Sequence, residues 1–152
     1  MRVFVTYEIP ESGLRMLREK FELDVYTGEE FLTKEEMIER ARKADAMVAH
    51  LRDPIDAEFI QSLEKMKIIA DYAVGYNNID VQVATERGIY VTHTPGVLTE
   101  ATADIAFALI LAVARRIVES DKFVRDGKFV GWKPKLMLGY DLYGKTLGII
   151  GM

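Results

Sequence analysis

The sequence contains no cysteine, which excludes disulfide bonds, cysteine-ligated zinc, iron–sulfur clusters and thiol catalysis. Glycine and proline are also scarce: 11 Gly and 4 Pro make 15 of 152 residues, too few for a collagenous or low-complexity chain. Basic residues are not in excess, since 20 Lys and Arg stand against 24 Asp and Glu, a formal net charge of −4. Because phosphate binding needs a clustered basic surface, we expect no nucleic-acid partner. The 49% hydrophobic and 29% charged residues are typical of a folded globular chain.

Long apolar runs are missing as well. The most apolar stretch covers residues 105–114 and is closed by Arg115 and Arg116, which is about half the length that a bilayer-spanning helix needs. We therefore expect no membrane partner. Without a disulfide framework or a secretory signal sequence, we expect a cytoplasmic location.

Two kinds of segment alternate along the first part of the chain. Helical patterns carry recognisable caps: Thr33 and Glu36 have the spacing of a capping box, and Asp56 and Asp80 precede two further helical segments. This alternation predicts an α/β fold, a doubly wound parallel sheet with helices on both faces. Five strands favour the flavodoxin-like order 2-1-3-4-5. The short β-rich runs are residues 3–7, 23–26, 46–50, 67–72 and 89–92.

The pattern changes after Pro95. Residues 99–124 predict one long helix that is apolar on most sides, and such a helix is normally buried on most sides. Residues 126–143 show no regular period, and residues 146–150 form an apolar run that predicts a strand. Since a parallel strand needs a crossover and a partner strand, we expect that a second domain begins near Thr99 and that most of it lies beyond this chain.

Ligands of open α/β sheets bind beyond the carboxyl ends of the strands. His50, His93 and the turn around Gly75 all fall at such ends. The turn has two interpretations: it is a tight connection that needs glycine for its φ, or it presents successive backbone N–H groups to an anion. The histidines suit general acid–base chemistry. No carboxylate is placed by the sequence to orient either ring, which favours a structural or cleft-lining role. No His or carboxylate pair has the spacing of a metal site.

Residues 139–146 match the phosphate-binding pattern G-x-x-x-x-G-K-[ST]. That motif works between a strand and a helix whose N-terminus faces the phosphates. In this chain a strand-like apolar run follows the match instead of a helix. The order of elements therefore favours an accidental match.

Three segments together resemble one known family. They are residues 68–80 (IIADYAVGYNNID), 87–104 (RGIYVTHTPGVLTEATAD) and 144–151 (GKTLGIIG). The sequence resembles the D-2-hydroxyacid dehydrogenase family, in particular its archaeal glyoxylate (hydroxypyruvate) reductase type, over the whole chain but only the first part of the family's usual length. The resemblance implies a flavodoxin-like substrate domain at residues 1–97. It implies that residues 98–152 are the truncated start of a Rossmann domain that binds NAD or NADP.

The family reduces 2-oxoacids to D-2-hydroxyacids by hydride transfer, so the resemblance implies a reductase of a small 2-oxoacid such as glyoxylate or hydroxypyruvate. It implies that the backbone amides of Val74 and Gly75 hold the substrate carboxylate and that His50 lines the substrate pocket. Thr102 is similar to a position near the cofactor. Gly151 is similar to the first glycine under the cofactor's pyrophosphate.

The resemblance also bears on assembly and on what the chain lacks. Residues 123–143 resemble the arm through which family members dimerise, which implies a homodimer. His93 stands where the family often has Asn, and we expect this departure to alter loop hydrogen bonding more than chemistry. The family's catalytic Arg and Glu–His pair have no counterpart in the 152 residues, so we expect no catalytic residue in this chain. The alternative function is a non-catalytic binding or dimerisation module.

Overall fold

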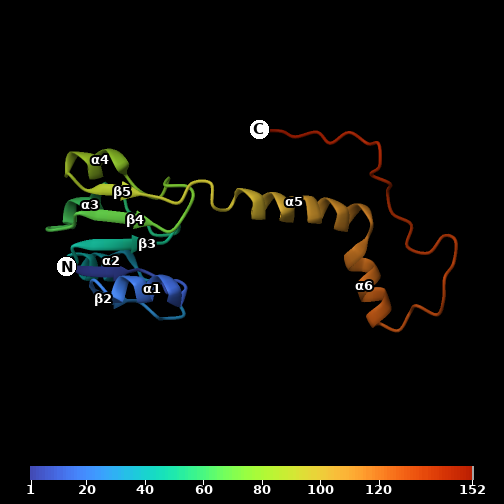
Figure 1. Ribbon diagram of the computed structural model, residues 1–152, viewed down its shortest axis with the longest axis horizontal. Coiled ribbons are helices and arrows are strands. Elements are labelled where there is room, and N and C mark those ends of the chain that lie inside the picture. The colour runs from blue at the N-terminus through green and yellow to red at the C-terminus, as the bar shows by residue number, and fades with distance from the viewer. Residues whose placement is uncertain (152) are drawn as a thin grey trace. The chain divides into compact units, whose positions relative to one another are not determined.

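The computed structural model describes residues 1–151, and its contacts divide the chain into two compact units, Met1–Val97 and a second that begins at Leu98. The strands of the first unit form one parallel sheet in the order β2-β1-β3-β4-β5, which confirms the predicted sheet and strand order. Its elements are β1 (Arg2–Val5), α1 (Glu11–Arg18), β2 (Glu22–Val25), α2 (Lys34–Ala41), β3 (Ala46–Ala49), α3 (Ala57–Ser62), β4 (Ile68–Asp71), α4 (Val81–Glu86) and β5 (Tyr90–Thr92) (Figure 1).

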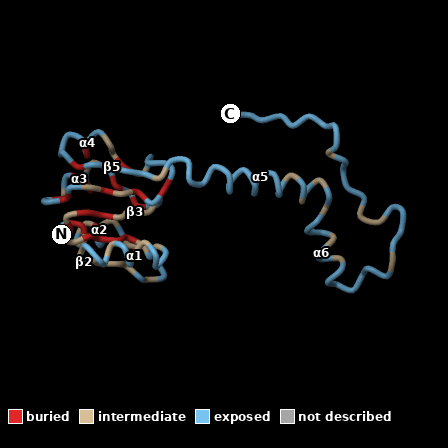
Figure 2. The backbone as a smooth tube through the Cα atoms, viewed as in Figure 1, coloured by how far each residue is buried: buried red, intermediate tan, exposed pale blue. Residues whose placement is uncertain are grey.

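The two faces of the sheet pack against different helices, because successive strand residues point to opposite sides. On one face, Phe4 and Met47 lie in a core cluster with residues of α2, α3 and α4. On the other face, Val3 and Val5 pack around Leu14 of α1. Figure 2 shows the buried residues concentrated along the strands of this unit. Helices therefore cover both faces, as predicted, and burial of each large apolar side chain contributes about 1.5–3 kcal/mol.

The predicted helix caps are all confirmed. The Glu36 N–H donates to Thr33 Oγ1 at 3.3 Å, and the Thr33 N–H donates to Glu36 Oε2 at 2.8 Å, which completes the capping box of α2. The Thr33 N–H holds the pKa of Glu36 below its ordinary value. Asp56 and Asp80 accept the backbone N–H three residues on, at 2.9 and 3.0 Å, and cap α3 and α4.

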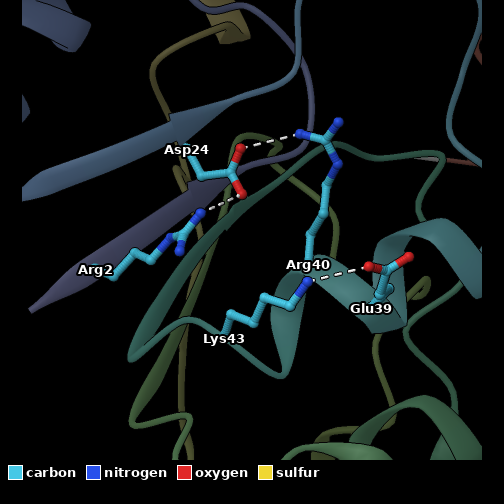
Figure 3. A network of polar contacts seen from close by, with 5 residues as sticks. All are labelled: Arg2, Asp24, Glu39, Arg40 and Lys43. Carbon is cyan, nitrogen blue, oxygen red and sulfur yellow. Dashed lines mark hydrogen bonds and ion pairs between the residues drawn. The ribbon is translucent and has the colours of Figure 1, made fainter.

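A network of ion pairs joins α2 to the β1–β2 edge of the sheet (Figure 3). Arg2 of β1 and Arg40 of α2 approach the two carboxylate oxygens of Asp24 on β2, at 3.1 and 2.9 Å. Lys43 pairs with Glu39 at 3.0 Å. Because these side chains are partly exposed, each pair contributes at most about 1 kcal/mol. Their shared acceptor nevertheless links α2 to the edge strand β2 and to its neighbour β1.

The second unit begins with two helices, α5 (Thr99–Ala114) and α6 (Ile117–Arg125), so the prediction of one helix over residues 99–124 is wrong. The chain breaks at Arg116, whose left-handed φ of 54° is unfavourable for a residue with a Cβ. An ion pair with Glu119, 2.8 Å from Arg116 Nε, supports that conformation. Within the described chain α5 has no buried residue, contrary to the expectation for an apolar helix (Figure 2). No helix among residues 1–151 is both long and apolar enough to cross a membrane.

Residues 126–151 contain neither helix nor strand. The strand predicted at residues 146–150 is wrong for this structure, because the run pairs with no other strand of the described chain. The phosphate-loop match at residues 139–146 has no strand before it and no helix after it. Gly139 instead packs so closely on the end of α5 that a Cβ would collide with the Ala114 carbonyl oxygen. The Tyr140 N–H donates to the same oxygen at 2.7 Å, so this glycine has a packing role.

Candidate functional site

Three loops meet at the carboxyl ends of β3, β4 and β5: residues 50–53, 72–78 and 93–96. The Asn78 side-chain amide joins the first two, since its Nδ2 donates to the carbonyl oxygens of His50 and Asp53 at 3.3 and 3.4 Å. Loops at this edge carry the ligands of open α/β sheets. The amide of Asn78 therefore fixes the middle loop beside the loop that bears His50.

The third loop holds the middle loop from the other side. The Thr94 N–H and hydroxyl donate to the Ala73 carbonyl oxygen at 2.8 and 2.9 Å. His93 Nδ1 lies 2.8 Å from the Val74 carbonyl oxygen, and because a carbonyl only accepts, this nitrogen carries the proton. The His93 ring also packs edge-on against Tyr76, with centroids 5.1 Å apart. His93 thus takes part in loop hydrogen bonding, as expected for a histidine that stands where the family often has Asn.

The tip of the middle loop exposes backbone donors. The N–H groups of Val74 and Gly75 donate to no group of the described chain, and both residues are exposed. Gly75 does not have a left-handed φ, and no atom lies within 4 Å of the position that a Cβ would occupy. The interpretation that the turn needs glycine for its φ is therefore wrong. What glycine provides is open space beside two free donors, which favours the anion interpretation.

A buried carboxylate fixes the loop after β3. Asp53 Oδ2 accepts the Thr6 hydroxyl at 2.5 Å and the His50 N–H at 2.6 Å, while the Asp53 N–H donates to the His50 carbonyl oxygen at 2.9 Å. Thr6 and Asp53 are both buried. The backbone of His50 is thereby held at the end of the sheet.

The His50 ring belongs to an aromatic cluster. Its centroid lies 5.7 Å from that of Phe31 and 5.8 Å from that of Tyr7. His50 Nδ1 accepts the Arg52 N–H at 3.4 Å, and the Arg52 guanidinium lies over Phe31 at 5.0 Å. Within residues 1–151 no carboxylate hydrogen-bonds to this ring or to that of His93. Packing of this kind suits a residue that lines a cleft.

Asp71, the last residue of β4, is a buried carboxyl that directly precedes the middle loop. It is 2% exposed, and neither carboxylate oxygen has a hydrogen-bond partner within the described chain. Burial raises the pKa of Asp71, and the negative charge of Asp53 raises it further. The nearby Asn78 amide offsets part of this effect without the geometry of a hydrogen bond, and positive charge on His50 or His93 acts in the same direction.

Sequence reasoning did not single out Thr6, Asp53, Asp71 and Asn78 as site residues. Each is a polar residue at or just after the end of an apolar β-rich run, or in the turn that follows it. A search of those positions for every polar side chain, rather than for His and Gly alone, would have found them.

Thr102 and Gly151 both belong to the second unit and are exposed. Thr102 lies in the first turn of α5. Gly151 has a φ of 82°, and no atom lies within 4 Å of its would-be Cβ. This conformation and this space fit a glycine that a pyrophosphate approaches closely. No group of three or more His, Asp or Glu side chains within residues 1–151 forms a metal site.

Comparison with solved structures supports the same fold. A structure from Thermus thermophilus matches with a TM-score of 0.88 and 49% identity, over 93% of this chain and 46% of that one. A 3-phosphoglycerate dehydrogenase from Entamoeba histolytica, solved with NAD⁺ bound, matches with a TM-score of 0.64 and 29% identity, over 76% of this chain and 39% of that one.

Comparison of sequences identifies the family. A glyoxylate reductase from Korarchaeum cryptofilum is 60% identical over 152 residues, which cover 99% of this chain and 46% of that protein. The chain thus spans less than half the length of this curated relative. The family model for the catalytic domain of D-isomer specific 2-hydroxyacid dehydrogenases matches residues 3–141. The predicted resemblance is confirmed, and the chain belongs to the D-isomer specific 2-hydroxyacid dehydrogenase family.

Proposed function

We propose that this chain is the substrate-binding part of a reductase that converts a small 2-oxoacid, such as glyoxylate or hydroxypyruvate, to the D-2-hydroxyacid. The observation that carries the proposal is the pair of free, exposed N–H groups of Val74 and Gly75 beside open space. A carboxylate accepts several hydrogen bonds and suits two adjacent donors. The similarity to a glyoxylate reductase supports the choice of substrate.

Each unit has its own role in this proposal. The first unit, residues 1–97, is the substrate domain, in which His50 and its aromatic neighbours line the pocket. The second unit is the start of the domain that binds NAD or NADP, with Thr102 near the cofactor and Gly151 beneath its pyrophosphate. The cofactor, when bound, supplies the hydride, and the residues of this chain bind and orient the oxoacid.

Glyoxylate binding to the ¹⁵N-labelled chain tests the proposal. We expect saturable NMR shifts of the Val74 and Gly75 amide signals as glyoxylate is added. Glycolaldehyde, which has no carboxylate, is the control and should leave both signals in place. The proposal fails if glyoxylate shifts neither signal, or if glycolaldehyde shifts them equally.

The 152-residue chain alone should not oxidise NADH or NADPH in the presence of glyoxylate. Neither the His50 nor the His93 ring hydrogen-bonds to a carboxylate of the described chain that would orient it as a proton donor. Loss of nicotinamide absorbance is the measurement, with heat-denatured chain as the blank. Turnover that rises in proportion to chain concentration would contradict this expectation.

We also propose that the chain forms a homodimer through α5 and the arm at residues 123–143. The side chains of Ile105, Phe107 and Val113 are 63%, 58% and 77% exposed. Each large apolar side chain left in water forgoes about 1.5–3 kcal/mol, and a dimer buries such side chains from both protomers, which offsets a cost of association of about 4–15 kcal/mol. Light scattering after size exclusion should therefore give twice the 17.3 kDa mass of the monomer.

A variant tests whether the apolar face of α5 forms the dimer interface. Phe107→Asp places a charge on the exposed face of α5 and should shift the scattering mass to that of the monomer. Glu64→Gln, an exposed change in the first unit, should leave the dimer intact. A sharp peak of the unaltered chain at 17.3 kDa would contradict the dimer.

A further inference from the structure

The carboxyl of Asp71 has no structural partner that explains its burial. The residue is 2% exposed and neither oxygen accepts a hydrogen bond from the described chain. A buried carboxylate without donors is costly, whereas the protonated carboxyl is tolerated far better. The other buried acid of the unit, Asp53, differs because it accepts the Thr6 hydroxyl and the His50 N–H. Asp71 is therefore the acid at this edge whose burial has no structural explanation.

Asp71 directly precedes the loop of the proposed anion site in the chain. It is the last residue of β4, paired in register with Ala49, and the loop that carries the free Val74 and Gly75 donors begins at the next residue. An ionised Asp71 puts a buried negative charge at the start of the loop whose N–H groups receive an anion. A protonated Asp71 removes that repulsion.

The groups that act electrostatically on Asp71 come from the neighbouring loops. Asp53 and His50 lie in the loop after β3, His93 begins the loop after β5, and the neutral Asn78 amide comes from the middle loop. Asp53 disfavours ionisation of Asp71, whereas the Asn78 amide and positive charge on either histidine favour it. Within the described residues no lysine or arginine donates a hydrogen bond to the carboxyl oxygens of Asp71.

We propose that Asp71 takes up a proton when an anion binds to the loop at residues 72–78, so that anion affinity falls as Asp71 ionises. The inference rests on the proposed function, in which this loop holds the substrate carboxylate. The proton comes from solvent and is released when the anion leaves, which balances the step. Linkage is reciprocal, so a bound anion must shift the protonation of Asp71 by the same factor as ionisation weakens binding.

NMR of the full ¹³C,¹⁵N-labelled chain tests the coupling. The Asp71 carboxyl carbon is titrated with pH, first alone and then with saturating glyoxylate. The glyoxylate Kd is measured from the Gly75 amide signal below and above the Asp71 midpoint. We expect a midpoint above the ordinary Asp range, a further rise with glyoxylate, and a Kd that weakens by up to about tenfold for each pH unit above the midpoint.

Two variants make the result specific. Asp71→Asn is neutral at every pH and nearly the same shape, so its glyoxylate Kd should not depend on pH and should equal that of the unaltered chain at low pH. Glu64→Gln removes an exposed carboxylate of the same unit and should keep the pH dependence.

The results that would overturn the coupling differ from those that would overturn the proposed function. Glyoxylate shifts of Gly75 with a pH-independent Kd overturn the coupling and leave the proposed function standing. No Gly75 shift at any pH overturns both. An Asp71 midpoint within or below the ordinary Asp range overturns the coupling without any ligand, whatever the variants do.

Discussion

Gly75→Val should weaken glyoxylate binding by about a hundredfold or more while leaving the stability of the chain nearly unchanged. Hydrogen bonds from N–H groups to a charged acceptor contribute about 1.5–3 kcal/mol each, and about 1.4 kcal/mol is a factor of ten in affinity. A valine side chain fills the space beside the Val74 and Gly75 donors. No atom lies within 4 Å of the new Cβ and φ is not left-handed, so the substitution should not strain the fold.

The measurement pairs a glyoxylate titration with urea unfolding of each variant. Gly148→Val is the matched control, since Gly148 also has no atom within 4 Å of its would-be Cβ and no left-handed φ, but lies in the second unit. Gly148→Val should change neither the glyoxylate affinity nor the free energy of unfolding. Unaltered glyoxylate affinity in Gly75→Val would remove Gly75 from the site.

The fold of the first unit could be predicted because its signals are local. A capping box such as that of Thr33 and Glu36 acts within one turn of helix. The apolar β-rich runs are short and separated by capped helices, and connections of this kind admit few topologies. The strand order β2-β1-β3-β4-β5 therefore followed from the pattern of elements, without any single contact being known.

The second unit could not be predicted in the same way. Nothing in the residue types at Arg115 and Arg116 indicates a break, since neither is glycine or proline. The left-handed Arg116 pairs with Glu119, and residue types alone do not show that pairing. The apolar run at residues 146–150 has strand propensity, but a strand also needs a partner, and sequence alone does not show whether one is present.

Only part of the candidate site could be predicted from the sequence. His50, Val74 and Gly75 stand out because strand ends and glycine turns can be read from the order of residues. Asp53 does not, because its function depends on Thr6, which lies 47 positions away in the chain. Burial likewise raises the pKa of Asp71, and the residue type alone does not show that this side chain is buried.

Asp53→Ala should destabilise the first unit by about 3 kcal/mol or more. The side chain is buried and accepts two short hydrogen bonds, from the Thr6 hydroxyl and the His50 N–H, each worth about 1.5–3 kcal/mol when the acceptor is charged. Alanine leaves the His50 N–H without a partner and leaves the Thr6 hydroxyl only the Val48 carbonyl oxygen, 3.4 Å away. Urea unfolding monitored by circular dichroism measures the loss.

Two further variants show whether burial and bonding are the cause. Asp121→Ala breaks an exposed pair with Arg125 and should cost less than about 1 kcal/mol. Asp53→Asn keeps an oxygen acceptor but removes the charge, so it should cost less than Asp53→Ala. Because the negative charge of Asp53 raises the pKa of Asp71, Asp53→Asn should also lower the Asp71 titration midpoint. An equal stability for Asp53→Ala and the unaltered chain, or a rise of the Asp71 midpoint in Asp53→Asn, would contradict the role assigned to this carboxylate.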